Sequence, residues 1–168
     1  MRNLINFKDI KNEIFIRENF YSLIIILIIF LIDRYSKVQI INNFSDNAFY
    51  INNYINLDLI WNTGIGFGLL SFEASWVYNL ISLTIGSVII LLFYYAIKAN
   101  TSEKIICSSI IGGAIGNFYD RAIFNAVPDF IDLHYGNLHW FTFNIADIFI
   151  TLGVFLLILI SIFKKDEN

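Results

Sequence analysis

Two aspartates in apolar surroundings are the residues of this chain best suited to chemistry. Asp129 follows Pro128, the one proline of the chain, and Asp147 lies within a long apolar run near the C-terminus. Proline fixes its own φ and favours an extended residue before it, so the chain is stiff where it approaches Asp129. Two carboxylates that meet in a low-dielectric site share a proton, so one acts as base on a water while the other acts as acid. Such a pair can hydrolyse a peptide bond, and Asp120 and Asp132 are rival members of it.

Polar residues at helical spacing accompany these carboxylates. Gly113, Asn117 and Arg121 are four residues apart and form one stripe of a helix, while Asn144 shares a helix face with Asp147 three residues later. Asparagine in lipid needs a partner, and a glycine beside it leaves the backbone open to a neighbouring helix or a bound chain. This stripe is therefore a candidate binding surface.

Two further pairs have simpler interpretations. Asp33 and Lys37 are four residues apart in the acid-first order that favours an ion pair. Gly112 and Gly116 form a G-x-x-x-G pattern, which is typical of close packing between membrane helices.

The composition places the chain in the membrane class. Of 168 residues, 57% are hydrophobic and 15% are charged, whereas an ordinary soluble domain is about 25% charged. The mean hydropathy is +0.65. The net charge of −3 gives no argument for a nucleic-acid partner. The single cysteine, Cys107, can form no intramolecular disulfide and is expected to be a buried, inert residue.

Four membrane spans are predicted within one compact unit, residues 1–168, and they cover residues 23–41, 76–97, 105–121 and 140–163. Four spans put both termini on one side. Eight lysines and arginines lie on that side against three towards the other, so both termini are predicted to be cytoplasmic. The intramembrane charges cluster just below the exterior surface, with Asp147 about 10 Å below the start of the fourth span at Trp140.

Two segments are expected on the exterior side. Within residues 42–75, Ile55, Leu57 and Leu59 alternate with Asn56 and Asp58, and asparagines offer turns, which predicts short strands and a small sheet on the membrane surface. Residues 122–139 are expected to form an exterior loop. His134 and His139 lie in or beside this loop, and without a metal-binding spacing they are expected in surface or interfacial positions.

From the residues alone, three classes of function stay open: a membrane protease, a small transporter and a non-catalytic scaffold. Intramembrane Asp, Asn and Arg suit a transporter as well as an enzyme. A transport pathway, however, needs polar groups across the full depth of the membrane, whereas these charges stop near one face.

Five motifs in order resemble bacterial lipoprotein signal peptidase, also called signal peptidase II. They are "DRYSK" (33–37), "NTGIGFG" (62–68), "GGAIGNFYDR" (112–121), "VPDFID" (127–132) and "FNIAD" (143–147). Each motif alone is weak, but five in order on a four-span chain are specific. The resemblance covers residues 20–163, and Pro128 stands where the family is expected to have an aliphatic residue.

The resemblance implies a membrane-embedded aspartic endopeptidase, an α-helical protein with four transmembrane helices and a small exterior β-sheet between the first two. Its substrate would be a prolipoprotein with diacylglycerol on a cysteine, cut on the amino side of that cysteine. The family's catalytic aspartates fall on Asp129 and Asp147. Residues implied in holding substrate are Asn62, Gly113, Asn117, Arg121, Asn144 and Ala146, and residues implied as structural are Asp33, Lys37 and Asp120.

The resemblance also implies the surroundings of the enzyme. It would be a monomer in the bacterial inner membrane, in contact with membrane lipids, with its active site near the exterior face and no metal or other cofactor. Residues 42–75 would form a cradle over the substrate, and residues 122–139 a flexible flap.

Overall fold

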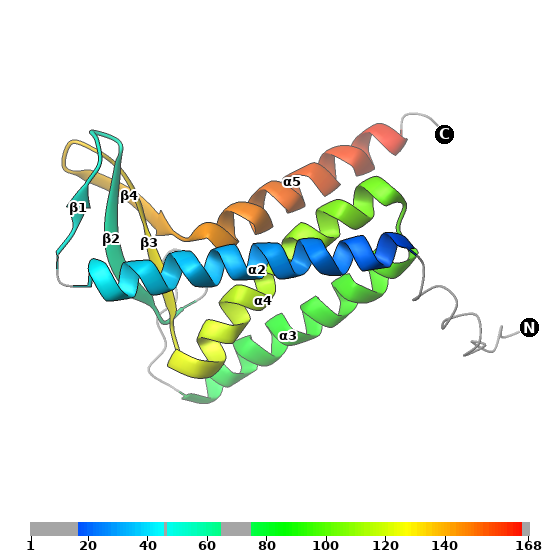
Figure 1. The fold of residues 1–168 in the computed structure, drawn as a ribbon, viewed down its shortest axis with the longest axis horizontal. Helices are drawn as coiled ribbons and strands as arrows, with labels where there is room; N and C mark the ends of the chain where they lie inside the picture. The colour runs from blue at the N-terminus through cyan, green and yellow to red at the C-terminus, as the bar shows by residue number, and fades with distance from the viewer. Residues whose placement is uncertain (1–16, 46, 65–74, 166–168) are drawn as a thin grey trace, which may run out of the picture.

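The computed structural model describes residues 17–45, 47–64 and 75–165, and within them it has four long helices and one sheet (Figure 1). The helices run side by side, and the sheet lies at one end of them. They are α2 (Arg17–Asn43), α3 (Ser75–Lys98), α4 (Thr101–Phe124) and α5 (Ile145–Lys165).

Helix α4 is the centre of the bundle, because it packs against each of the other three helices. It begins at the N-cap Asn100, whose side chain accepts a hydrogen bond from the backbone N–H of Glu103. It ends at Asn125, a left-handed residue with φ of 53° that turns the chain towards the sheet. Cys107 is fully buried against apolar side chains of the bundle, as expected for an inert cysteine.

Glycines let α4 approach its neighbours closely. A Cβ at Gly112 would lie 2.9 Å from the carbonyl oxygen of Ile26, and one at Gly116 would overlap a carboxylate oxygen of Asp33, both on α2. A Cβ at Gly113 would lie 2.7 Å from the carbonyl oxygen of Ala146 on α5. Gly112 and Gly116 therefore allow close packing of α4 against α2, and Gly113 allows close packing of α4 against α5.

The sheet is antiparallel, in the order β1-β2-β3-β4. Its strands are β1 (Phe49–Tyr50), β2 (Ile55–Asn62), β3 (Val127–Tyr135) and β4 (Leu138–Phe143). The prediction of a sheet formed between the first two helices was incomplete, because half of its strands follow α4. Residues 122–139, expected as a loop, contain β3, an inner strand that is buried over most of its length and bonded on both sides.

The predicted start of the last span was also wrong. Residues 138–143 form β4, so α5 begins at Ile145 and not at Trp140. Apolar periodicity does not separate a strand from a helix when both are apolar, and here the strand runs directly into the helix. Asp147 is consequently in the first turn of α5, and the expected depth of about 10 Å below a helix end does not apply.

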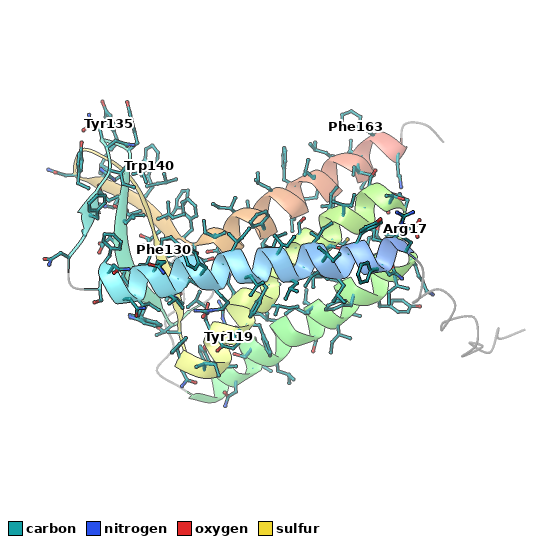
Figure 2. All side chains as sticks on the ribbon, viewed as in Figure 1. Arg17, Tyr119, Phe130, Tyr135, Trp140 and Phe163 are labelled. Carbon is teal, nitrogen blue, oxygen red and sulfur yellow. The ribbon has the colours of Figure 1, made fainter. Side chains whose placement is uncertain are left out.

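Two of the described helices are long and apolar enough to cross a membrane by length and composition, namely Tyr78–Lys98 and Ile145–Lys164. Many large apolar side chains on the helices point outward, as the sticks in Figure 2 show. Helices α2 and α4 contain the bundle's buried charges, which lower their hydropathy.

Candidate active site

Asp129 lies near the start of β3, where the sheet meets the helices. Its neighbour Phe130 marks this junction in Figure 2. The aspartate is 4% exposed, and its carboxylate accepts hydrogen bonds from the side-chain amides of Asn62 at 2.9 Å and Asn144 at 2.6 Å. Burial, followed by the negative charge of Asp147, raises the pKa of Asp129 to about 6, although both amides favour the ionised form and lower the pKa.

Asp147 is fixed by the start of α5. Asn144 is the residue before the helix, and its side-chain oxygen accepts from the Asp147 backbone N–H at 3.1 Å. In return, the Asp147 carboxylate accepts from the Asn144 backbone N–H at 3.1 Å. This reciprocal pair is a capping box, which fixes the first turn of a helix.

Asn144 therefore contacts both aspartates: its amide donates to Asp129 while its oxygen and backbone bond to Asp147. The two carboxylates line one cavity of about 150 Å³, which has room for water. The cavity is lined by Asn62, Asn117, Arg121, Val127, Asp129, Thr142, Asp147, Ile150 and Thr151.

Asn117 joins this cavity to a buried cation. Its side-chain nitrogen donates to Asp147 at 2.8 Å, and its oxygen accepts from the Lys37 ammonium at 2.8 Å. The helix stripe of Gly113, Asn117 and Arg121 was expected to be a binding surface that offers hydrogen-bond donors to an incoming chain. In the structure, one donor of Asn117 already bonds to a carboxylate.

A buried ion network lies behind Asn117. The Lys37 ammonium donates to Asp33 at 2.8 Å and to Asp120 at 2.7 Å, and all three side chains are fully buried. Arg34 also pairs with Asp120, and Asp33 accepts from the Ala146 backbone N–H at 3.0 Å. Arg34 had no expected role in the site, although its place in "DRYSK" next to Asp33 was a usable signal.

The Arg121 side chain bonds to backbone carbonyl groups and not to the carboxylate of its sequence neighbour Asp120. Its guanidinium donates to the carbonyl of Asn117 at 3.2 Å and to that of Gly64 at 3.5 Å. The backbone N–H of Gly64 in turn donates to the side-chain oxygen of Asn62 at 2.9 Å. Arg121 thus connects α4 with the end of β2 at the rim of the cavity.

The structure brings all of the sequence-predicted site residues into one region, but in different ways. Gly113 and Ala146 contribute close backbone contact between α4 and α5 and do not line the cavity. Asp120 and Asp132, the rival carboxylates, also lie outside its lining. Asp120 is bound by Lys37 and Arg34, and Asp132 contacts His139 at 2.7 Å.

His134 is 5% exposed on the inner strand β3, so it does not lie at the protein surface, one of the two positions expected for it. Its backbone N–H donates to the carbonyl of Tyr54. The expected surface position fits His139 better, since its side chain is 58% exposed.

The cavity has the parts for attack of water on an amide. One buried carboxyl with a pKa of about 6 can hold a proton near neutral pH, and a second carboxylate lies beside it. Such a pair can accept a proton from water and donate one to a carbonyl oxygen.

Comparison with known proteins gives one consistent result. The family described as signal peptidase (SPase) II matches residues 25–163. A lipoprotein signal peptidase from Pelagibacter ubique (strain HTCC1062) is 46% identical over 160 residues, which cover 94% of this chain and 96% of that protein. One from Francisella tularensis subsp. mediasiatica (strain FSC147) is 40% identical, covering 91% of this chain and 98% of that protein.

The fold agrees with solved structures as well. One described as a bacterial membrane enzyme at 2.3 Å resolution superposes with a TM-score of 0.72 at 30% identity, covering 88% of this chain and 90% of that one. A second, at 1.9 Å, has a TM-score of 0.68 at 29% identity and covers 84% and 92%. The ordered motifs, the fold and the extent of these matches together show that the chain belongs to the signal peptidase II family.

Proposed function

We propose that this chain is an aspartic endopeptidase that removes signal peptides from prolipoproteins, with Asp129 and Asp147 as the catalytic pair. Membership of the signal peptidase II family supports the reaction and its aspartic chemistry. The single observation that carries the residue assignment is the cavity that both carboxylates line, with Asn144 bonded to each of them. Family membership also favours the protease over a transporter or a scaffold.

In the proposed mechanism, the pair holds one proton and one water. The ionised carboxylate takes a proton from the water, whose oxygen attacks the scissile carbonyl carbon, while the other carboxyl donates its proton to the carbonyl oxygen. The tetrahedral intermediate then collapses: the carboxyl that took the water's proton gives it to the leaving nitrogen, the C–N bond breaks, and the other carboxylate takes back a proton from a hydroxyl of the intermediate. The raised pKa of Asp129 supports this residue as the holder of the shared proton before attack.

The proposed substrate is a prolipoprotein whose cysteine carries diacylglycerol, and the bond cut lies on the amino side of that cysteine. A mostly apolar groove of about 290 Å³ that includes Asp147 in its lining supports this substrate, because acyl chains need an apolar surface next to the scissile bond. Its lining residues are Phe141, Phe143, Asp147, Ile148, Thr151 and Leu152.

The proposed topology is a monomer with four membrane-crossing helices, both termini cytoplasmic and the active site near the exterior face of the bacterial inner membrane. The start of α2 and the end of α5 lie at the same end of the bundle, opposite the sheet, which supports this arrangement (Figure 1). The low hydropathy of α2 and α4 is compatible with it, since Asp33, Lys37 and Asp120 bond to one another inside the bundle.

The first prediction tests the catalytic pair. Asp129→Asn and Asp147→Asn should each slow cleavage of a lipidated prolipoprotein by at least about 10²-fold, because an amide cannot exchange the proton. Cleavage would be measured with purified protein in detergent, alongside membrane insertion and thermal unfolding of each variant.

The matched control for that experiment is Asp58→Asn, an aspartate of β2 outside the cavity lining. It should cleave at the wild-type rate. Near wild-type turnover in either member of the pair would remove that residue from the mechanism, while failure of wild-type protein to cleave would remove the proposed reaction itself.

A further inference from the structure

A cluster of metal-ligand side chains lies on the β3–β4 hairpin and has no part in the proposed reaction. It consists of Asp132, His134 and His139, which offer one ligand atom each within 4.8 Å of one another. The backbone places them together: Asp132 and His134 are two residues apart on β3, and His139 on β4 is the cross-strand partner of His134. These are also the only two histidines of the chain.

The three side chains converge on one carboxylate oxygen. Oδ2 of Asp132 lies 2.7 Å from Nδ1 of His139 and 3.5 Å from Nδ1 of His134. The two imidazole rings stack at 5.4 Å between centroids with an interplanar angle of 23°. A break in the strand register between Leu133 and His134 shifts the hairpin at the cluster, and such irregularities re-aim side chains.

His134 supplies an independent indication of a ligand. It is 5% exposed, and its Nδ1 has no hydrogen-bond partner among the described residues. A buried polar atom left without a partner costs about 1–3 kcal/mol, and an ion is one of the groups that satisfy such an atom. This Nδ1 is on the side of the ring that faces Asp132.

We propose that Asp132, His134 and His139 bind one divalent transition-metal ion of the Zn²⁺ type. Two imidazoles and a carboxylate suit Zn²⁺ and its neighbours, whereas Mg²⁺ and Ca²⁺ prefer oxygen ligands alone. Three protein ligands leave a fourth position of a tetrahedral ion for water. The 58% exposed side chain of His139 gives the ion and that water a path from solvent. The spacing of these residues in the sequence gave no such indication, because the ligands meet only across the hairpin.

The ion's place in the fold gives it a structural effect. It joins β3 to β4 across the hairpin. Its ligand Asp132 is three residues after Asp129, and its ligand His139 is five residues before Asn144. It therefore stabilises the hairpin that carries Asp129, which lines the cavity, and that ends next to Asn144, which bonds to both aspartates. None of the three ligands lines that cavity, so the ion takes no part in hydrolysis.

The test is binding of Zn²⁺ alone to the full-length protein in detergent, purified without a polyhistidine tag and stripped with a chelator. Isothermal titration should give one Zn²⁺ per chain, and Co²⁺ at the same site should give the visible absorption of a tetrahedral complex. His139→Ala should weaken Zn²⁺ binding by more than about 100-fold, since even partners that only orient a ligand are worth about 10–100-fold. Zn²⁺ should also slow amide hydrogen exchange in residues 127–143 of the wild type and leave that of His139→Ala unchanged.

His139→Ala is the main variant because its exposed side chain can be removed without opening the core. Asp132→Asn gives a second check, and Asp58→Asn is the control for loss of an acidic residue of the sheet that lies outside the cluster. Equal Zn²⁺ affinity in the wild type and His139→Ala, or no stoichiometric binding in the wild type, would overturn the proposal. Cleavage is not the readout, so its outcome is separate from that of the proposed function.

Discussion

The side-chain amide of Asn117 has one orientation that satisfies both of its partners. The Lys37 ammonium can only donate hydrogen bonds and the Asp147 carboxylate accepts them, so the amide oxygen must face Lys37 and the nitrogen must face Asp147. Lys37, which lies outside the cavity lining, therefore determines that the nitrogen of Asn117, and not its oxygen, faces Asp147. Lys37 acts on Asp147 through Asn117, as a positioning residue.

Loss of Lys37 should damage the fold before the chemistry can be measured. Lys37→Met leaves Asp33 buried without its cation and Asp120 with Arg34 alone, and breaking a buried ion pair in this way costs about 3–5 kcal/mol. Thermal unfolding in detergent should show a large drop in midpoint. Lys164→Met is the control, because the Lys164 side chain is 55% exposed where it pairs with Glu103, and an ion pair with one solvent-exposed member should cost less to break than a fully buried one. Equal midpoints for the two variants would contradict the account of a buried network.

The pH dependence of cleavage should report on Asp129. Its pKa is about 6, so kcat/KM should fall as pH rises through this value and the pair loses its shared proton. The amide of Asn62 favours the ionised form, so Asn62→Ala should raise the pKa of Asp129 and move the basic limb to higher pH. Thr63→Ala, an exposed neighbour, should leave the limb in place. A shift to lower pH in Asn62→Ala would reverse the assigned role of the amide.

At the scale of elements, the site depends on how closely α4 and α5 approach. A Cβ at Gly113 would lie 2.7 Å from the Ala146 carbonyl, so Gly113→Ala must separate the helices and lengthen the Asn117–Asp147 hydrogen bond. We expect a loss of about 1–3 kcal/mol in stability, together with reduced cleavage.

Gly86→Ala is the matched control for that substitution. A Cβ there would meet only the edge of the Phe118 ring at 3.4 Å, an ordinary contact. Alanine in a helix is favoured over glycine by about 0.5–1 kcal/mol, so this variant should unfold at the same temperature as wild type or higher. A thermal scan of both variants distinguishes close packing from a general intolerance of alanine.

The sequence predicted three of the four helices well and the sheet only in part. A charge-free apolar run predicts α3, and the apolar run 105–119 predicts the centre of α4. The i, i+4 pairs place Asp33 with Lys37 and Asn117 with Arg121 on shared faces. Strands β3 and β4 escaped prediction for different reasons. Strand β3 is buried almost throughout, so it shows no apolar–polar alternation, and β4 carries no Asp, Glu, Lys or Arg and runs directly into the apolar helix α5. The capping role of Asn144 was missed as well, because the boundary between β4 and α5, which lies at this residue, was not predicted.

At the scale of the whole molecule, the described part of the chain presents apolar helices to its surroundings and a small sheet at one end (Figure 1). Substrate affinity should therefore come largely from acyl chains, at about 0.8 kcal/mol per buried CH₂, and from confinement in one membrane. A prolipoprotein that lacks diacylglycerol should be cut poorly or not at all, although its peptide sequence is the same. Parallel assays of lipidated and unlipidated substrate check this expectation, and equal rates would show that the peptide alone is recognised.

The pairing of β2 with β3 has a consequence for how the protein is made. Asn62 and Asp129 are 67 residues apart in the chain, and Asn144 follows Asp129 by 15. Synthesis from the N-terminus therefore produces β2 first, then two helices, and only then the strand that pairs with it. Until β3 emerges, one edge of β2 has open hydrogen-bonding groups, and contacts of such high sequence separation form slowly. With Asp129 and Asp147 as the proposed catalytic pair, the newly made chain can acquire its hydrolytic centre only after the start of α5 has left the ribosome, and every shorter nascent chain should be inactive.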